Sequence, residues 1–409
     1  MARILLVSPV PIYPTTGGNR ERIRRLLGAL QGLGHEVHLL YVTEEPDGDV
    51  QAMRESWGDR FHLFDYDRAR TPNRGSPSFH RTPIGRVLRR ALVQVGVNFT
   101  FPYSVDDWYD EEVGSHLRAL QGRYGFEQVW LEYVFLAKSL LVLPPGVLKV
   151  VDTNDVFTDR HRRYRRQAQP AVWFSTTRRE ERKALRRADV IVAIQEEEAR
   201  FFRQLVPDKR VVTVGHFIEL CALPFKLDAP LELLFLASGN EANLHGLRVF
   251  LLEVLPRIRR HHPGVRLLLA GTVCRAVADD PSYSKLGEFT RAAEVYGRAD
   301  IVVGPIPFGT GLKIKNMEAL GFGKPLVTTP AGAEGIGEGA GSAFLVGRTA
   351  QEFATQVNAL LADPELRRNT AERAYRFATA YRRRSLESLR SVLETDLDAS
   401  PRGQPTAPP

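Results

Sequence analysis

Residues 297–336 read GRADIVVGPIPFGTGLKIKNMEALGFGKPLVTTPAGAEGI, and the rest of the chain can be interpreted outward from them. A short apolar strand, Ile301–Val303, leads into a glycine-rich loop at Pro307–Gly311. A helix follows and ends near Gly321, and a second strand begins at Leu326. Buried strands that alternate with loops and helices are typical of a parallel sheet. This stretch therefore predicts an α/β fold.

The loop and the helix that follows it have the chemistry of an anion site. The loop ends Gly309, Thr310, Gly311, so the backbone can approach a phosphate closely where the first N–H groups and the positive end of the helix converge. Lys313 adds a charge, and Glu318 offers a carboxylate to which a ribose diol would donate. Together these features predict a nucleotide diphosphate site. The alternative is an ordinary strand–helix–strand unit whose glutamate faces solvent.

The order of these residues resembles the donor-binding core of GT-B glycosyltransferases, specifically the GT4-like group, with its pattern G-T-G-x-K-x-K-x-x-E-A-L-x-x-G-K-P. Many members carry two glutamates here. The first would fall at Thr310, so only Glu318 remains in this chain, and the contact of the first glutamate with the sugar is not carried over. The resemblance implies two Rossmann-like domains whose parallel sheets face each other across a cleft.

The length of 409 residues favours two domains. We expect an N-terminal Rossmann-like acceptor domain at 1–220 and a C-terminal Rossmann-like domain for the nucleotide-sugar donor at 231–380. A helix at 381–397 is expected to return to the N-terminal domain, as the resemblance implies. Residues 398–409 are too polar and proline-rich to fold.

The N-terminal domain opens with a buried strand at Arg3–Val10, a loop that contains Gly17 and Gly18, and a helix at Arg20–Leu33. This order predicts the first unit of a doubly wound sheet. The loop lacks the G-x-G-x-x-G pattern, so dinucleotide binding is not favoured. In the GT4-like group a glycine pair here lets the loop face the cleft, so both glycines are assigned to donor binding. The alternative is a flexible turn.

A polar cluster follows the predicted strand at Lys149–Asp152, and the end of a parallel strand is where α/β proteins place their chemistry. Members of the GT4-like group commonly carry a histidine where Asn154 stands here, so no proton transfer is assigned to this position. We predict that Asp155 orients hydroxyl groups of the sugar or acceptor, and we count it as catalytic together with Lys313. The alternative is that Asp152 and Asp155 only cap the next helix.

Two further loops are assigned to the donor. Asn243 ends a loop that is similar to the first C-terminal-domain loop of the group, and it is also expected to cap a helix at Leu244–His261. Capping alone would explain this asparagine equally well. Gly332 and Gly335 lie in the loop after the second strand, where backbone N–H groups could contact a diphosphate.

The predicted reaction moves a sugar from a nucleotide diphosphate sugar to a hydroxyl acceptor, and the resemblance implies retention of configuration without a metal. Lys313 and the N–H groups of Gly309–Gly311 would stabilise the leaving diphosphate. Closure of the domains would exclude water. No carboxylate pair stands out as nucleophile and acid, so a double displacement is not assigned, and a same-face mechanism with a loose ion pair is the fallback. The nucleotide sugar is a co-substrate, and no separate cofactor is expected.

The net charge of +8 favours an anionic partner. Residues 160–187 hold eleven basic side chains against two glutamates. A predicted amphipathic helix at 84–95 carries Arg86, Arg89 and Arg90. Both regions could contact a membrane surface or an anionic, lipid-linked acceptor. The alternative for residues 160–187 is a solvated helix face, and the alternative for residues 84–95 is a helix that packs on the core while its arginine tips reach water. Nucleic-acid binding is not expected, because stacking aromatic residues are not interleaved with the basic ones.

Two lone cysteines, Cys221 and Cys274, are not spaced for zinc and favour a reducing compartment. The first residues lack the layout of a signal peptide, and every apolar run is too short to span a bilayer. We therefore expect a cytoplasmic protein, peripheral at the inner face of the membrane if the basic regions bind lipid. Two other functions remain open: a nucleotide-sugar epimerase of the same architecture and a non-catalytic nucleotide-sugar-binding protein.

Overall fold

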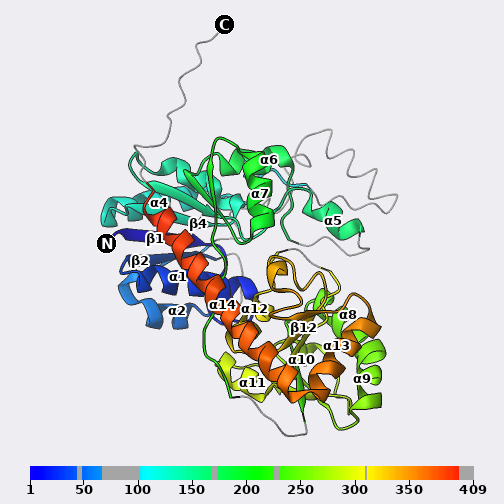
Figure 1. Ribbon diagram of the computed structural model, residues 1–409. Helices are drawn as coiled ribbons and strands as arrows, with labels where there is room; N and C mark the ends of the chain where they lie inside the picture. The colour runs from blue at the N-terminus through cyan, green and yellow to red at the C-terminus, as the bar shows by residue number, and fades with distance from the viewer. Residues whose placement is uncertain (44–47, 67–101, 167–172, 225–230, 309–310, 396–409) are drawn as a thin grey trace.

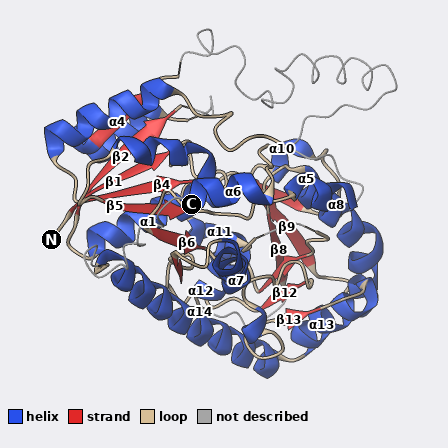
Figure 2. Ribbon diagram, turned by 90° about the horizontal axis from the view of Figure 1, so that it is seen from above, coloured by secondary structure: helices blue, strands red, loops and turns tan. Residues whose placement is uncertain are grey.

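The computed structural model describes residues 1–43, 48–66, 102–166, 173–224, 231–308 and 311–395. In this part of the chain two parallel sheets form, one in each half of the sequence, and helices pack around them (Figures 1 and 2). The predicted α/β architecture with two parallel sheets is therefore confirmed. The amphipathic helix predicted at 84–95 lies outside the described residues.

The first sheet has seven strands in the order β3-β2-β1-β4-β5-β6-β7, and each neighbouring pair is parallel. The strands are β1 (Arg3–Ser8), β2 (Glu36–Val42), β3 (Phe61–Phe64), β4 (Gln128–Glu132), β5 (Leu148–Asp152), β6 (Val190–Ala193) and β7 (Arg210–Thr213). The helices around it are α1 (Gly18–Gly32), α2 (Val50–Trp57), α4 (Glu111–Tyr124), α5 (Arg160–Arg166), α6 (Arg178–Leu185) and α7 (Glu196–Leu205), with 3-10 helices η1 (Gly58–Arg60) and η3 (Val134–Val142). The direction of winding reverses between β1 and β4.

The second sheet repeats this pattern with six strands in the order β10-β9-β8-β11-β12-β13. The strands are β8 (Glu232–Leu236), β9 (Arg266–Ala270), β10 (Ser284–Gly287), β11 (Ile301–Gly304), β12 (Leu326–Thr328) and β13 (Leu345–Val346). The helices are α8 (Glu241–Val249), α9 (Leu255–His261), α10 (Val273–Ala276), α11 (Ala292–Arg298), α12 (Ile314–Gly321), α13 (Ala350–Ala362) and α14 (Pro364–Leu393), with a π turn η4 (Phe250–Val254) and a 3-10 turn η5 (Gly337–Gly339). Here the winding reverses between β8 and β11.

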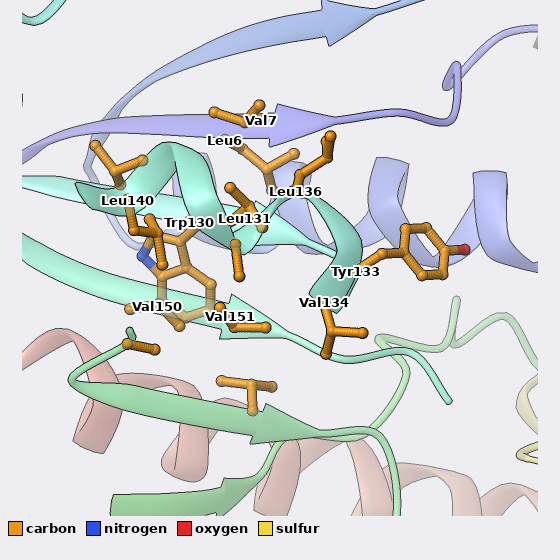
Figure 3. Packing of buried hydrophobic residues seen from close by; sticks show 14 of the residues in the cluster. Leu6, Val7, Trp130, Leu131, Tyr133, Val134, Leu136, Leu140, Val150 and Val151 are labelled. Carbon is orange, nitrogen blue, oxygen red and sulfur yellow. The ribbon is translucent and has the colours of Figure 1, made fainter. Parts of the chain in front are cut away.

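Each sheet is rigid because its central strands are apolar on both faces. Figure 3 shows side chains from β1, β4, β5 and η3 that pack together in the first domain. Trp130 on β4 is completely buried there, and its indole Nε1 donates to Gln128 Oε1 at 3.2 Å. Burial of such a side chain stabilises the fold by about 2–3 kcal/mol, so the loops at the strand ends start from fixed positions.

The long helix α14 joins the two domains. It begins in the second domain, where the Asp363 carboxylate caps it by accepting from Glu365 N and Leu366 N at 2.9 Å. Figure 1 shows it running across the molecule from one domain to the other. Its last turns place Leu389 and Val392 in the core of the first domain. The helix therefore couples the positions of the two sheets.

One predicted helix is interrupted. The segment expected to form a single helix up to His261 consists of α8, the π turn η4 and α9. Pro256 stands at the start of α9 and has no N–H group, so it cannot donate the regular bond to the preceding turn.

Among the helices of the described ranges, none is long and apolar enough to cross a bilayer.

Candidate functional site

The two reversal points locate the candidate site. In open α/β sheets, ligands bind beyond the carboxyl ends of the strands at the point where the winding changes direction. In the second sheet this point lies between β8 and β11, so the loops that leave these two strands frame it. They are residues 237–240 after β8 and residues 305–313 after β11. The second loop contains Gly311 and Lys313, which were assigned to the donor from sequence, and Asn243 lies in the first turn of α8, just after the first loop. Gly309 and Thr310 lie outside the described residues.

The loop after β8 corrects the capping prediction. Asn240, not Asn243, caps the following helix, because its side chain accepts from Asn243 N at 2.9 Å. The helix therefore begins at Glu241, three residues earlier than expected. The Asn243 amide donates to Ser238 O and Oγ, both at 3.0 Å, and its oxygen accepts from Lys315 Nζ at 2.8 Å. Asn243 therefore joins the loop after β8 to helix α12 across the reversal point.

Lys313 stands at the N-cap position of α12. Its ammonium donates to the carbonyl of Gly311, a glycine whose φ of 76° is rare for other residues, and pairs with Glu334 Oε2 at 3.5 Å. Burial lowers the pKa of Lys313, while Glu334, Asp155 and Glu198 oppose that effect. A cation that is held among acids at the start of a helix is well placed to receive an anionic ligand.

A second ammonium group, Lys315, lies on the same helix, and no role was assigned to it from sequence. Its bond to Asn243 places it at the reversal point, and its Nζ lies 5.4 Å from the centre of the Phe235 ring on β8. Burial, and then the charge of Lys313, lower the pKa of Lys315 to about 7. The alternation of the two lysines was visible in the sequence, but the inward direction of the second one depends on the orientation of the helix.

Glu318 faces the first domain. Burial, and then Glu21 of α1, raise its pKa to about 8, while Arg25 and Arg24 of the same helix act in the opposite direction. Three residues further along α12, a Cβ added to Gly321 would lie 2.2 Å from Ile218 in the connection between the domains. The face of α12 that carries Glu318 is therefore packed toward α1 and the connection, and this carboxylate does not face bulk solvent.

On the first domain, Asp155 follows β5. Its carboxylate accepts from its neighbour Val156 N at 2.8 Å and from Arg160 Nε at 3.0 Å, at the start of α5. Asp152 does not act as a cap, which corrects that alternative for this residue. It is buried, and its two oxygens accept from Arg22 Nη2 at 2.9 and 2.8 Å. Asp152 therefore ties β5 to α1, whereas Asp155 is an electrostatic neighbour of Lys313 on the second domain.

The structure adds two residues that the sequence interpretation missed, Gln195 and Glu198 at the start of α7. Gln195 Nε2 donates to Glu198 Oε1 at 3.1 Å, while Gln195 Oε1 and Glu198 Oε2 are buried and have no hydrogen-bond partner within the described ranges. Burial, followed by Asp155, raises the pKa of Glu198 to about 8. A Cβ added to Gly311 would lie 3.7 Å from Glu198 Oε1, so this acid meets the glycine loop of the other domain.

The loop before α1 closes another side of the gap. Gly17 caps α1, and a hollow of about 560 Å³ separates it from the loop after β8, lined among others by Thr16, Asn240 and Arg275. A Cβ added to Gly18 would lie 3.3 Å from Ile314 Cγ1, so the starts of α1 and α12 approach closely. The glycine pair was interpreted as facing a cleft, and the structure places it beside the donor-assigned loops.

Part of the chain is similar in sequence to a known protein family. A family model described as "Glycosyl transferases group 1" matches residues 230–363, which include the second sheet. This part of the second domain is similar to that glycosyltransferase family. No curated protein sequence matches the chain.

Solved structures of glycosyltransferases share the complete two-domain fold. S. aureus TarM has a TM-score of 0.67 at 10% identity, with 97% of this chain and 100% of that chain covered. The pneumococcal O-GlcNAc transferase GtfA has a TM-score of 0.65 at 11% identity, with 96% and 99% covered. Sucrose-phosphate synthase from Thermosynechococcus elongatus has a TM-score of 0.64 at 15% identity, with 96% and 98% covered. The fold of the chain is therefore GT-B.

In the second domain, the two glycines of the loop after β12 have structural reasons to be glycine. A Cβ added to Gly332 would lie 1.9 Å from Thr328 Oγ1, and the carbonyl of Gly332 accepts from Asn316 Nδ2 at 2.9 Å. Gly335 has a φ of 79°, and a Cβ there would lie 2.2 Å from Gln195 Oε1 of the first domain. This loop therefore approaches the other domain by its backbone, as a diphosphate contact would require.

The basic run at 160–187 is partly neutralised by nearby acids. Arg160 pairs with Asp155 at 3.0 Å, Arg187 with Asp106 at 2.6 Å, and Arg186 with Asp208 at 3.2 Å. Arg162, Arg178, Arg179 and Arg182 remain exposed. Much of the local charge therefore serves to hold α5 and α6 in place, and the exposed remainder is available to a partner.

Proposed function

We propose that this protein moves a sugar from a nucleotide diphosphate sugar to a hydroxyl acceptor with retention of configuration. The observation that carries the proposal is the arrangement between the domains: the ammonium group of Lys313, at the start of α12, is an electrostatic neighbour of Asp155 and of the buried Glu198 of the first domain. Lys315 lies beside Lys313 on the same helix and interacts with it electrostatically. Two structures with the same fold, GtfA and TarM, contain UDP, which supports a donor of this class.

The leaving diphosphate belongs on the second domain. It would lie at the start of α12, where unpaired N–H groups and the helix dipole favour an anion. Glu334 now neutralises Lys313, and the diphosphate would replace this carboxylate as the partner of the ammonium. Lys315 would contribute a second charge through its bond with Asn243. Stabilisation of the departing phosphate oxygens by fixed donors of this kind lowers the barrier to cleavage.

The sugar and its acceptor belong between the two domains. Glu318 would accept hydrogen bonds from the ribose diol, and Asp155 would orient hydroxyl groups of the sugar or acceptor. Glu198 has a pKa near 8, so at neutral pH its acid form can donate to an oxygen. In the same-face route, the bond between the sugar and phosphate breaks and the acceptor oxygen bonds to the sugar carbon. The acceptor proton passes to the departing phosphate oxygen.

For the location of the protein, we propose the cytoplasm, with contact at the inner membrane surface when the acceptor is lipid-linked. The exposed arginines Arg162, Arg178, Arg179 and Arg182 support this idea, since clustered basic side chains are attracted to anionic lipids.

A ligand screen followed by a transfer assay tests the proposed function. Nucleoside diphosphates and their sugars would be screened by thermal shift, and the best ones titrated by calorimetry. We expect at least one nucleoside diphosphate to bind, and its sugar to release nucleoside diphosphate faster when a hydroxyl acceptor is present. Absence of binding across the panel would overturn the proposal. A sugar isomer formed without acceptor would favour an epimerase, and binding without turnover would favour a non-catalytic receptor.

A further inference from the structure

A second hollow, of about 520 Å³, shares no lining residue with the hollow beside Gly17. It is bounded by α1, by the connecting residues 217–220 and by α14, which crosses both domains in Figure 1. We call it the hinge groove. Its apolar lining includes Leu33, Phe217, Ile218, Leu220 and Leu386. Its charged lining consists of Arg24, Arg25, Arg382, Arg390 and Glu219. The groove is therefore both basic and apolar.

The groove exists because one face of α1 lacks side chains. Gly28 and Gly32 are one helical turn apart and lie on the same face, with Ala29 beside them. A Cβ added to either glycine would meet no heavy atom within 4 Å. Glycine in a helix costs about 0.5–1 kcal/mol relative to alanine. A pair of glycines that open space opposite Leu386 thus lowers helix stability and leaves a binding volume.

The charge of the groove is only partly compensated. Arg24 and Arg25 both pair with Glu21 at 2.6 Å, and Arg25 also bonds to Glu219. Arg382 and Arg390 are exposed, and within the described residues their side chains form no ion pair.

These two arginines are eight residues apart on α14, with Leu386 midway between them, so all three share one face of the helix. Guanidinium groups bind phosphate oxygens in pairs of parallel hydrogen bonds. The spacing therefore presents two phosphate-binding groups with an apolar side chain between them.

We propose that the hinge groove binds an organic phosphate that carries an apolar portion, with the phosphate among Arg25, Arg382 and Arg390 and the apolar portion against Leu33 and Leu386. The volume lies within the range of about 300–1,000 Å³ that is usual for small-molecule sites. The ligand is an amphiphilic anion, either a soluble phosphate ester or the head of a lipid-linked phosphate. This site is separate from the proposed donor site, and its ligand binding does not depend on transferase activity.

A ligand bound in the hinge groove would affect the candidate site. The groove is built from α1 of the first domain, the connection, and α14, which are the parts that join the two domains. Arg25 and Glu219 of the groove are also electrostatic neighbours of Glu318. A phosphate that draws Arg25 away from its acids changes the field at Glu318. Because coupling between two sites is reciprocal, a nucleoside diphosphate in the cleft would change the affinity of the groove by the same factor.

Calorimetry on the full chain tests the proposal with geranyl monophosphate as the probe, and with inorganic phosphate and geraniol as its two halves. We expect geranyl monophosphate to bind more tightly than either half. Arg382→Glu with Arg390→Glu should weaken it by about tenfold or more, since two charge-assisted contacts are lost. Gly28→Leu should weaken it similarly by filling the groove. The matched control, Arg368→Glu with Arg376→Glu, reverses two exposed arginines with the same spacing on α14 outside the groove, and should bind normally.

Four results discriminate further. Equal binding by the wild type and by the Arg382→Glu, Arg390→Glu variant would overturn the proposal, as would inorganic phosphate binding as tightly as geranyl monophosphate. Competitive displacement by a nucleoside diphosphate would place the probe in the cleft and also overturn it. Vesicles of phosphatidylcholine with and without phosphatidic acid separate the two sources. If the protein sediments with the vesicles only when phosphatidic acid and both arginines are present, the ligand of the groove is a lipid phosphate. If the protein binds geranyl monophosphate but does not sediment with the vesicles, the ligand is a soluble ester.

Discussion

The carboxyl edges of the two sheets have the same strand order but opposite chemistry. At the second sheet, α12 presents the ammonium groups of Lys313 and Lys315 beside glycine-rich backbone. At the first sheet, the segments after β5 and β6 present Asp155 and Glu198. Strand order decides where a ligand can bind in each domain. The side chains decide that an anion is favoured on one edge and hydroxyl groups or a proton on the other.

This contrast assigns different parts of the substrate to the two edges. Removal of a charge from the basic edge should affect departure of the diphosphate, whereas changes on the acidic edge should affect pH dependence and the bound hydroxyl groups. Four experiments test this assignment.

Lys313→Ala should have the largest effect. Loss of the charge beside the leaving diphosphate is expected to lower kcat about 100- to 1,000-fold, as removal of one fixed donor does at an oxyanion site. Steady-state release of nucleoside diphosphate measures it, with Lys285→Ala as a control in the same domain. A wild-type rate for Lys313→Ala together with a large loss for Lys315→Ala would move the role to the second lysine.

Glu198→Gln tests the acidic edge through pH. An unfolded glutamate has a pKa of about 4.3, whereas that of Glu198 is raised to about 8. Between these values the folded protein keeps a proton that the unfolded chain has lost, so the wild type loses stability as pH rises. The variant has no carboxyl group at this position, so its free energy of unfolding does not fall in this way. Between about pH 5.5 and pH 7.5 its free energy of unfolding should rise relative to that of the wild type by up to about 2.7 kcal/mol, at about 1.36 kcal/mol per pH unit.

Urea denaturation at both pH values measures this difference. The matched control is Glu197→Gln, an exposed neighbour on the same helix, which should show no such pH trend. A Glu198→Gln difference that does not change with pH would show that this carboxyl group keeps an ordinary pKa in the folded protein.

Glu318→Ala should weaken binding of a nucleoside diphosphate by about 1 kcal/mol, the loss of a hydrogen bond to the ribose, because a carboxyl group with a pKa of about 8 is largely uncharged at neutral pH. Affinity for inorganic pyrophosphate should stay unchanged, because that ligand has no ribose. Calorimetry of the wild type and the variant, each with the ribonucleotide and the 2′-deoxyribonucleotide, completes a double-mutant-type cycle. If the wild type and the variant discriminate equally between the two sugars, Glu318 does not contact the ribose 2′-hydroxyl.

Asn240→Ala and Asn243→Ala give the smallest effects and separate two roles in one loop. Loss of the cap at Asn240 should lower stability by about 1 kcal/mol. Asn243→Ala removes the partner of Lys315 and should reduce diphosphate affinity more than Asn240→Ala does. Thermal denaturation and calorimetry on both variants test this, and equal losses of affinity would contradict the assignment.

Local sequence signals were sufficient where a role depends on neighbouring residues. The two strands and the helix at 297–336 formed as predicted, because apolar runs and the glycines that end a helix act over a few residues. The same signals failed at Asn243, where two asparagines three residues apart could each cap a helix and only the backbone geometry selects Asn240. Glu198 was missed because acidic residues are common in the first turn of a helix, where they interact favourably with the helix dipole, so its position in the sequence did not indicate a functional role.

The amino-acid sequence by itself determined the α/β class, the two sheets and the glycine loop that leads into α12. Only the tertiary structure decided that Lys315 bonds to Asn243, that Glu198 meets Gly311, and that Gly28 and Gly32 open a groove opposite Leu386. The physical reason is distance along the chain. Secondary structure follows from short-range periodicity, whereas these contacts join residues of separate elements that become neighbours only when the two domains pack together.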